Sequence, residues 1–269
     1  MTIAPVLRRP LRPRSEPVVR RNWWLPAAGL LLPSALLLGW HLLAASGVYS
    51  PAQLPPPSAV WRAGVDLVGR GELQHHIAIS VQRVLIGFGI GTALGLALGG
   101  LVGLSRVARA VLAPTIHALR AVPSLAWVPL LLLWLGIGET PKITLVAIGA
   151  FFPVYTTVSA GLDHVDPRLR ELGKAYGRRG TALLTEVLIP AATPSILSGI
   201  RLGLAQGWLF LVAAELIASS MGLGFLLIDS ENTGRSDILL LTIVLLAILG
   251  KLSDSILGLA ERMVVRRWS

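Results

Sequence analysis

Long apolar stretches constrain the fold of this chain more than any polar motif does. The first of them reads WWLPAAGLLLPSALLLGWHLLAA over residues 23–45, and comparable stretches follow along the sequence. Of the 269 residues, 54% are hydrophobic and 14% are charged, whereas soluble domains carry about 25% charged residues. Because a soluble core could not bury so much apolar surface, we predict an all-α integral membrane protein. A stretch of roughly 20 apolar residues can cross a bilayer as a helix.

We predict about six spanning helices behind a basic tail. Residues 1–22 contain six arginines and four prolines, so they are expected to form a disordered cytoplasmic tail ahead of a membrane domain over residues 23–269. The first apolar stretch is longer than a typical signal-peptide core, so an uncleaved helix is favoured over a cleaved signal peptide. The predicted spans cover residues 23–45, 77–104, 108–136, 142–162, 191–219 and 237–260.

The distribution of basic residues predicts how these helices are threaded. With the N-terminus inside, sixteen Arg and Lys residues fall on the cytoplasmic side and four fall outside. An excess of basic residues in short cytoplasmic loops is typical of membrane proteins. We therefore predict cytoplasmic N- and C-termini and a cytoplasmic segment over residues 163–190. Basic residues that flank the spans on the cytoplasmic side account for the net charge of +10, so this charge does not indicate a nucleic acid partner. The four basic residues outside are Arg62, Arg70, Lys142 and Arg235.

The second predicted span carries a glycine at every fourth position. A row of small residues on one helix face lets a neighbouring helix approach closely in lipid. We therefore expect this face to serve helix packing. A nucleotide-binding interpretation of the glycines is discarded, because no strand precedes them. The five residues are Gly87, Gly91, Gly95, Gly99 and Gly103.

One charged passage interrupts the apolar sequence at residues 166–190, DPRLRELGKAYGRRGTALLTEVLIP. Asp166 and Pro167 are typical of a helix start, and Gly177 and Gly180 are expected to end that helix. A second short helix is expected over about 181–188. The apolar faces of the two helices carry Leu169, Leu172 and Tyr176, and then Leu184, Val187 and Leu188.

Two interpretations of this passage remain open from the pattern alone. The apolar faces could dock into a groove on a soluble partner at the cytoplasmic surface. Alternatively, the passage could be a surface loop that only connects two spans. Pro190 marks the expected junction with the fifth span.

Part of the passage resembles the EAA signature of ABC-importer permeases. In that signature Glu-Ala-Ala is followed after three residues by Gly, and after nine more by Ile-x-Leu-Pro. The same spacing joins Glu171-Leu172-Gly173, Gly177 and Val187-Leu188-Ile189-Pro190, with substitutions of similar size at the alanine pair, the first Ile and the Leu. In that family the segment forms coupling helices seated in a cleft on the ATPase subunit. The resemblance implies coupling residues Glu171, Leu172, Gly173, Ala175, Tyr176, Gly177, Val187 and Pro190.

The resemblance extends over roughly residues 50–267. Stretches such as LPPPSAVW, LGIGETPKI, FFPVY and LGKLSD are similar to the permeases for aliphatic sulfonates, with those for taurine and nitrate as close relatives. It implies the transmembrane fold of a type I ABC importer in a bacterial inner membrane. The implied partners are two ABC ATPase subunits, a second permease copy and a solute-binding protein. The implied cargo is an aliphatic sulfonate, with taurine, nitrate or another small anion as the alternative.

No sequence motif indicates catalysis or a cofactor in this chain. Gly173-Lys174 is followed by alanine and Gly250-Lys251 by leucine, so neither completes the phosphate-binding motif G-x-x-x-x-G-K-[ST]. The chain has no cysteine, which excludes thiolate metal sites. The resemblance implies a non-catalytic subunit without metal, whose partner ATPase binds ATP and Mg²⁺. An intramembrane enzyme is disfavoured because no histidine has a nucleophile nearby, and a passive channel because charges in the spans are sparse.

Four residues in or near the predicted spans are candidates for the pathway or its gate: Trp127, Glu215, Arg120 and Arg201. Glu215 lies toward the outer part of the fifth span, where a charge is costly. It could pair with a basic residue and support the gate, although a purely structural pair or a water-facing position is favoured. Arg120 and Arg201 could attract an anion, but snorkelling to the interface is favoured. Trp127 could line the pathway, pack internally or face lipid.

Overall fold

A computed structural model describes residues 29–268 of the chain. This part is helical and contains no β-strand, which confirms the predicted all-α fold. The predicted tail over residues 1–22 and the beginning of the first predicted span lie outside the described residues. In chain order the helical elements are α2 (Leu31–Ala45), α3 (Pro57–Gly69), α4 (Glu72–Leu104), α5 (Arg106–Ala121), η1 (Ser124–Ala126), α6 (Trp127–Leu135), α7 (Glu139–Asp163), α8 (Pro167–Ala175), α9 (Gly180–Leu183), η2 (Leu184–Leu188), α10 (Ile189–Ala218), α11 (Leu223–Asn232) and α12 (Ser236–Trp268).

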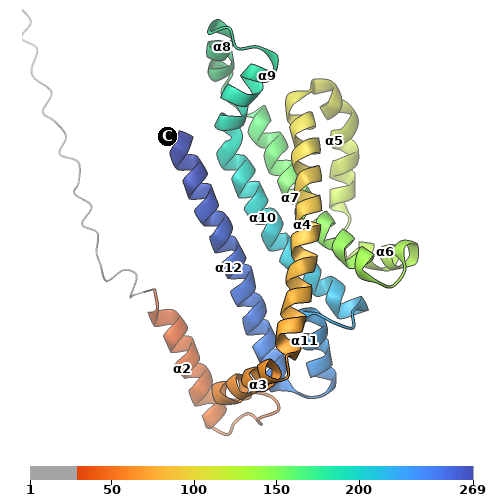
Figure 1. The fold of residues 1–269 in the computed structure, drawn as a ribbon, viewed down its shortest axis with the longest axis vertical. Coiled ribbons are helices and arrows are strands. Elements are labelled where there is room, and N and C mark those ends of the chain that lie inside the picture. The colour runs from red at the N-terminus through yellow and green to blue at the C-terminus, as the bar shows by residue number, and fades with distance from the viewer. Residues whose placement is uncertain (1–28, 269) are drawn as a thin grey trace, which may run out of the picture.

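Three long helices, α4, α7 and α10, form the centre of the bundle (Figure 1). α7 packs against both of the others. One buried apolar cluster takes Val84 from α4, Val146 from α7, and Leu204 and Leu211 from α10. These side chains pack the three helices against one another.

The glycine row of α4 lies against α7. A methyl group built on Gly87 would lie 2.6 Å from Val146 Cβ, and one on Gly95 would lie 2.8 Å from Val154 Cβ. The other glycines of the row meet α7 in the same way, which leaves no room for any side chain. Close contact of the two backbones replaces side-chain interdigitation along this interface.

The region predicted as one span over residues 108–136 is divided in the structure. α5 ends at Ala121, Val122 is extended (φ −70°, ψ 125°), and α6 then runs in a different direction (Figure 1). The physical cause is Pro123, because a proline disfavours the helical conformation of the residue before it. The region predicted as a single helix over residues 108–136 therefore forms two helices, α5 and α6.

The junction predicted at Pro190 is continuous in the structure. η2 is a single π-helical turn, and it leads directly into α10 with Pro190 near the first position of that helix. A proline removes one hydrogen bond of a continuous helix and crowds the turn before it, and the π-helical turn lies immediately before Pro190. The charged passage is therefore attached rigidly to the fifth predicted span.

Within residues 29–268, four helical stretches are long and apolar enough to cross a membrane: Glu72–Leu104, Glu139–Asp163, Gly180–Ile217 and Ser236–Val264. α2 is apolar but has 15 residues, fewer than the roughly 17–25 of a typical span. Membrane crossing by residues 23–45 and 108–136 stays a prediction.

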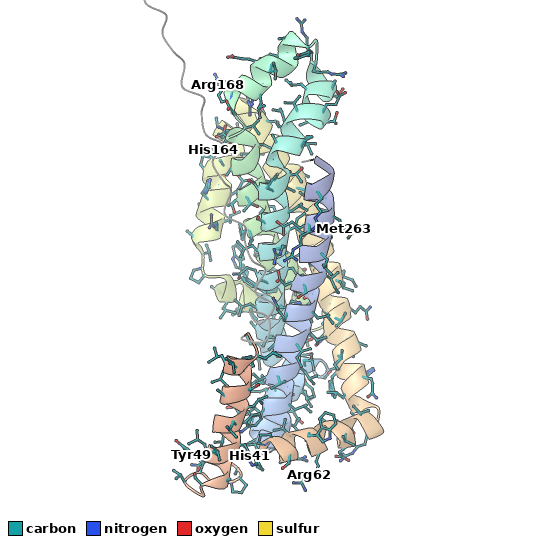
Figure 2. All side chains as sticks on the ribbon, turned by 90° about the vertical axis from the view of Figure 1, so that its left-hand side faces the viewer. His41, Tyr49, Arg62, His164, Arg168 and Met263 are labelled. Atoms are coloured by element: carbon teal, nitrogen blue, oxygen red, sulfur yellow. The ribbon has the colours of Figure 1, made fainter. Side chains whose placement is uncertain are left out.

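The two ends of the bundle carry different elements. α8 and α9 project at one end, where Figure 2 labels His164 and Arg168. α3, α11 and the loop after α2 lie at the other, where His41, Tyr49 and Arg62 are labelled. We call these the α8 end and the α3 end. Between them the outer faces of α2, α6 and α12 expose many large apolar side chains, as a lipid environment requires.

Candidate functional site

α8 is a short helix with well-defined ends. The Asp166 side chain accepts a hydrogen bond of 2.8 Å from the backbone N–H of Arg168, and Pro167 occupies the first turn. At the other end Gly177 has φ +77°, and the N–H of Arg178 donates to the carbonyl of Gly173 at 2.9 Å. This is the glycine-terminated helix end that satisfies the last carbonyl groups.

Gly173 brings the two short helices of the charged passage together. A methyl group at this position would lie 2.8 Å from Leu183 Cδ1 and 3.1 Å from Val187 Cγ2. Gly173, which replaces an alanine of the EAA signature, is therefore in close contact with the element that carries Val187. Arg178 and Glu186 form an ion pair of 3.0 Å across the same hinge.

The apolar faces of the two short helices are used differently. Leu172 and Tyr176 on α8 remain 54% and 78% exposed, and Glu171 and Ala175 beside them are also exposed. Leu188 on η2 is buried instead, and Val187 is half-buried against α8. Only the face of α8 is thus free for a partner within the described part of the chain.

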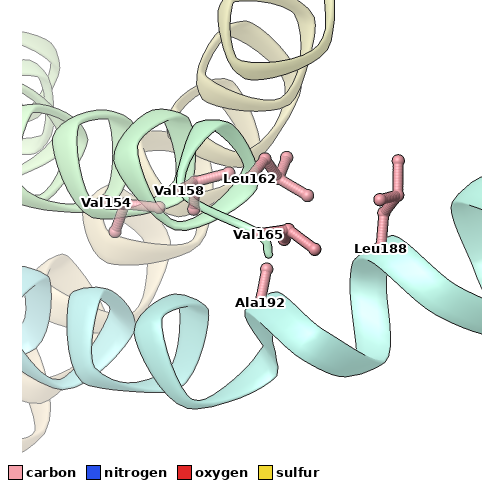
Figure 3. Packing of buried hydrophobic residues seen from close by; sticks show 6 residues of the cluster. All are labelled: Val154, Val158, Leu162, Val165, Leu188 and Ala192. Carbon is pink, nitrogen blue, oxygen red and sulfur yellow. The ribbon is translucent and has the colours of Figure 1, made fainter. Parts of the chain in front are cut away.

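Buried contacts tie this segment to two central helices. Leu188 and Ala192 on the η2–α10 side pack with Val165, which precedes α8, and with Val158 and Leu162 of α7 (Figure 3). The cluster spans the base of α8 and both adjoining helices. It therefore joins the segment just before α8 to both α7 and α10.

One arginine adds a polar link at the same place. Arg170 Nη2 on α8 donates a hydrogen bond of 2.6 Å to the carbonyl of Leu162 near the end of α7. The last carbonyls of a helix have no partner within it, and a guanidinium satisfies one of them here. Beside this link, a cavity of about 620 Å³ opens between α7 and α10, lined by residues that include Thr157, His164 and Ser195.

A buried charge cluster lies toward the α3 end. Glu215 of α10 is fully buried, and its carboxylate accepts hydrogen bonds from Ser80 Oγ at 2.9 Å and from the Gly224 N–H at 2.7 Å. Arg83 of α4 supplies the opposite charge, with 2.6 Å between Nη1 and Oε1. Glu215 therefore has a basic partner and does not face water, an arrangement that both the gate interpretation and the structural-pair interpretation of its sequence allow.

The second edge of the Arg83 guanidinium holds another carboxylate. Its Nε and Nη2 donate to the two oxygens of Glu139, each at 2.6 Å, and Lys142 Nζ lies 3.1 Å from Glu139 Oε1. Arg83 Nη1 also donates to the carbonyl of Met221 at 2.7 Å. Arg83 thus connects α4, α7, α10 and the α10–α11 loop. Sequence reasoning missed it as a site residue, although a charge within an apolar span is a recognised indicator of function.

Arg201 is neutralised by α12. Its Nε and Nη2 each lie 3.0 Å from a carboxylate oxygen of Asp254, and its Nη1 lies 2.8 Å from Glu261 Oε2. The side chain is therefore engaged in an interhelical ion-pair network and is not available as a free cation. This arrangement differs from the snorkelling favoured by its sequence position.

The other two pathway candidates, Arg120 and Trp127, lie outside the ion-pair networks of Arg83 and Arg201. Arg120 lies exposed at the end of α5. Trp127 begins α6 and is half-buried, and it lines an apolar cavity of about 420 Å³ together with residues that include Leu94, Phe151 and Phe152. None of the described residues 29–268 form a group of three or more His, Asp or Glu side chains that could hold a metal ion.

Comparison with known proteins identifies relatives over nearly the whole chain. Residues 91–266 match the family described as binding-protein-dependent transport system inner membrane component. The chain is 39% identical to the putative aliphatic sulfonates transport permease protein SsuC of Bacillus subtilis (strain 168), with 94% of this chain and 91% of the relative covered. It is 41% identical to the protein of the same description from Escherichia coli (strain K12), with 91% and 94% covered.

A solved structure shares the fold. The inward-facing MetNI methionine ABC transporter matches with a TM-score of 0.57 at 22% sequence identity. The match covers 77% of this chain and 98% of the chain in that structure. At this identity the similarity concerns the arrangement of helices alone.

Proposed function

Because this chain belongs to the family of binding-protein-dependent transport system inner membrane components, we propose that it is the translocating subunit of an ATP-driven importer. It is an ABC transporter permease and a multi-pass protein of the inner membrane. The proposed cargo is an aliphatic sulfonate handed over by a binding protein, since relatives of 39% and 41% identity are named for these compounds. Taurine, nitrate or another small anion is the alternative cargo.

The observation that carries this proposal is the exposed face of α8. Leu172 and Tyr176 expose apolar surface on a helix that projects beyond the bundle, and such surface favours a protein partner. The proposed partner is an ABC ATPase, with Glu171, Ala175 and Gly177 contributing to the contact. Gly173, Val187 and Pro190 act from behind this surface, because they pack α8 on η2 and lead into α10.

The proposed transport cycle uses the connections of the segment over residues 163–190. Two copies of this chain form the pathway between them, and each docks on one ATPase subunit. Closure of the ATPase pair on ATP and Mg²⁺ moves α8. The buried cluster of Val165, Leu188 and Ala192 and the hydrogen bond from Arg170 pass that motion to α7 and α10. The cavity between the two permeases then changes from inward-facing to outward-facing.

The proposed orientation places the α8 end in the cytoplasm, together with both termini. In this proposal residues 1–22 form a cytoplasmic tail, and residues 23–269 form the membrane domain. The binding protein then approaches the α3 end. We assign Glu215 to the support of an outer gate there, since it fixes the start of α11 through Gly224. Arg120 and Trp127 remain candidates for the pathway, and Arg201 is assigned a structural role.

The test is ligand-dependent ATP hydrolysis by the purified permease–ATPase complex in liposomes. The binding protein is preloaded with an alkanesulfonate, taurine or nitrate, or left empty. We expect stimulation by the alkanesulfonate-loaded protein alone. Stimulation only by taurine or nitrate would change the proposed cargo but would still support the importer function. A stable complex that no loaded binding protein stimulates would overturn the proposal.

A further inference from the structure

The buried cluster contains two cations that meet at one half-exposed carboxylate. The side chains of Arg83 and Lys142 are only 4% and 6% exposed, whereas that of Glu139 is 57% exposed. Burying a charge is expensive unless it is paired. The two buried cations therefore need paired counter-charges, and the carboxylate that they share is the one in contact with solvent.

The two carboxylates of the cluster are held to different degrees. Glu215 accepts hydrogen bonds from Ser80, from the backbone of Gly224 and from Arg83, and it is fully buried. Among the described residues, Glu139 accepts from Arg83 and Lys142 alone. Glu215 is thus the fixed counter-ion of Arg83, and Glu139 is the exchangeable one.

A small cavity opens beside the exchangeable pair. Its volume is about 220 Å³, and Arg83 and Glu139 form part of its wall. Apolar side chains of Ile79, Ile86 and Ile143 form another part, with Gln82 and Ser220 as neutral polar groups. The volume is below the roughly 300–1,000 Å³ of pockets for drug-sized ligands, so only a small molecule fits.

The chemistry of this wall selects a small anion with an apolar part. The Nε–Nη2 edge of an arginine binds a planar or tetrahedral oxyanion through two parallel hydrogen bonds. It holds the Glu139 carboxylate in that manner here. A sulfonate offers the same pair of oxygens, and a short alkyl chain attached to it would contact the isoleucines.

The charges of the cluster add up to zero, with two cations and two carboxylates. Adding an anion next to Glu139 would bring two negative groups together, which is unfavourable. The balance is kept only if the Glu139 carboxylate leaves as the anion enters. Glu139 is the first residue of α7 and follows a turn in which Gly136 has φ +75°, so its side chain lies at a helix end with solvent beside it.

We propose that Arg83 and Lys142 form an anion site for the sulfonate cargo, and that the Glu139 carboxylate occupies this site when no cargo is bound. The proposal rests on the proposed function for its cargo and orientation. The site lies toward the α3 end, where the binding protein releases its ligand. Displacement of Glu139 frees the start of α7, so arrival of cargo alters a helix that also contacts α8.

The experiment measures equilibrium binding of radiolabelled ethanesulfonate to the purified permease–ATPase complex, without binding protein or nucleotide. Replacing the competing carboxylate in Glu139→Gln is expected to strengthen binding by about tenfold, because a neutral amide competes less well than a carboxylate for the hydrogen bonds of Arg83. Arg83→Lys keeps the charge opposite Glu215 but removes the two-pronged edge, so it is expected to abolish binding. Asp66→Asn is the matched control, since it removes a carboxylate from the exposed Arg70 at the same end.

Unchanged or absent ethanesulfonate binding in Glu139→Gln would overturn the anion site. So would equal strengthening in Asp66→Asn. The proposed function is judged separately, from stimulation of the wild-type complex by its loaded binding protein. A complex that is stimulated by sulfonates but whose Glu139→Gln variant binds none would keep the function and lose this site.

Discussion

Arg83 of α4 and Glu215 of α10 form an ion pair inside the helix bundle, with 2.6 Å between Arg83 Nη1 and Glu215 Oε1. The two residues are 132 positions apart in the sequence. Both side chains are almost completely buried, so Glu215 depends on Arg83 for neutralisation, whereas Arg83 is also neutralised by Glu139. The pair fixes the end of α10 against α4 and, through Gly224, positions the start of α11.

Glu215→Gln is expected to lower the stability of the permease. Breaking a buried ion pair usually costs about 3–5 kcal/mol, and we expect roughly 2 kcal/mol here because Glu139 still neutralises Arg83. Thermal unfolding of the purified permease in detergent measures this. If Glu215 supports the gate, the assembled complex that carries Glu215→Gln should also show altered transport. Unchanged transport would show that Glu215 has a structural role only.

The exposed pair of Arg70 and Asp66 provides the control for this prediction. Ion pairs on the surface contribute about 0–1 kcal/mol, so Asp66→Asn is expected to leave the unfolding temperature nearly unchanged. A double variant, Arg83→Gln with Glu215→Gln, should be less destabilised than the sum of its single changes, since no charge is then left without its partner. Additive effects would show that the two residues do not act as a pair.

Gly95→Ala is expected to destabilise the α4–α7 contact. The added methyl group would lie 2.8 Å from Val154 Cβ, so the helices must separate, and overpacking of this kind costs about 1–3 kcal/mol. Gly100→Ala on the same helix meets no atom within 4 Å and should be neutral or slightly stabilising. Thermal unfolding in detergent compares them. Equal unfolding temperatures would contradict the packing role of the glycine row.

Gly177→Asp is expected to uncouple ATP hydrolysis from transport while the chain still folds. Gly177 has φ +77° and lies at the end of α8, where a new charge would enter the proposed contact with the ATPase. Gly234 provides a matched control, because it has φ +69° and also meets no atom within 4 Å. Gly234→Asp should therefore impose similar backbone strain and leave coupling intact. Normal uptake by Gly177→Asp would count strongly against the coupling role of α8.

Tyr176→Ala is expected to weaken binding of the ATPase subunit by about tenfold or more, as loss of an aromatic anchor in an interface does. The unfolding temperature of the permease should not change, because the side chain is largely exposed. Co-purification at graded salt and protein concentrations measures the affinity. Trp61→Ala removes a similarly exposed aromatic side chain at the α3 end and should have no effect. Equal behaviour of the two variants would place the ATPase elsewhere.

Local sequence patterns predicted part of the fold and of the site. Apolar length and the four-residue spacing of Gly87 to Gly103 indicate a closely packed helix, because both depend on residues within one element. The ends of α8 follow from Asp166, Pro167 and Gly177, whose preferences act over a few residues. The all-α fold and the family resemblance of the charged passage needed no long-range information.

The remaining features depend on contacts that no local pattern contains. Arg83 is one basic residue in an apolar stretch, and its partners Glu139 and Glu215 come from two other helices. Leu188 belongs to an amphipathic pattern that resembles that of α8, but it is buried by α7 and not left for a partner. Arg201 is paired through α12, 53 and 60 residues further along the chain. These pairings form only when helices that are distant in the sequence pack together in the bundle.

The proposed function of this chain is the import of sulfonates with energy from ATP. The most direct measurement is uptake of radiolabelled ethanesulfonate into liposomes that contain the permease–ATPase complex. The binding protein is added on the side of the α3 end, and ATP is supplied on the side of the α8 end. We expect sulfonate to accumulate only when binding protein and ATP are both present, and we expect this accumulation to be lost in Gly177→Asp although the complex still hydrolyses ATP. Hydrolysis by the wild-type complex without any accumulation of sulfonate, taurine or nitrate would contradict it.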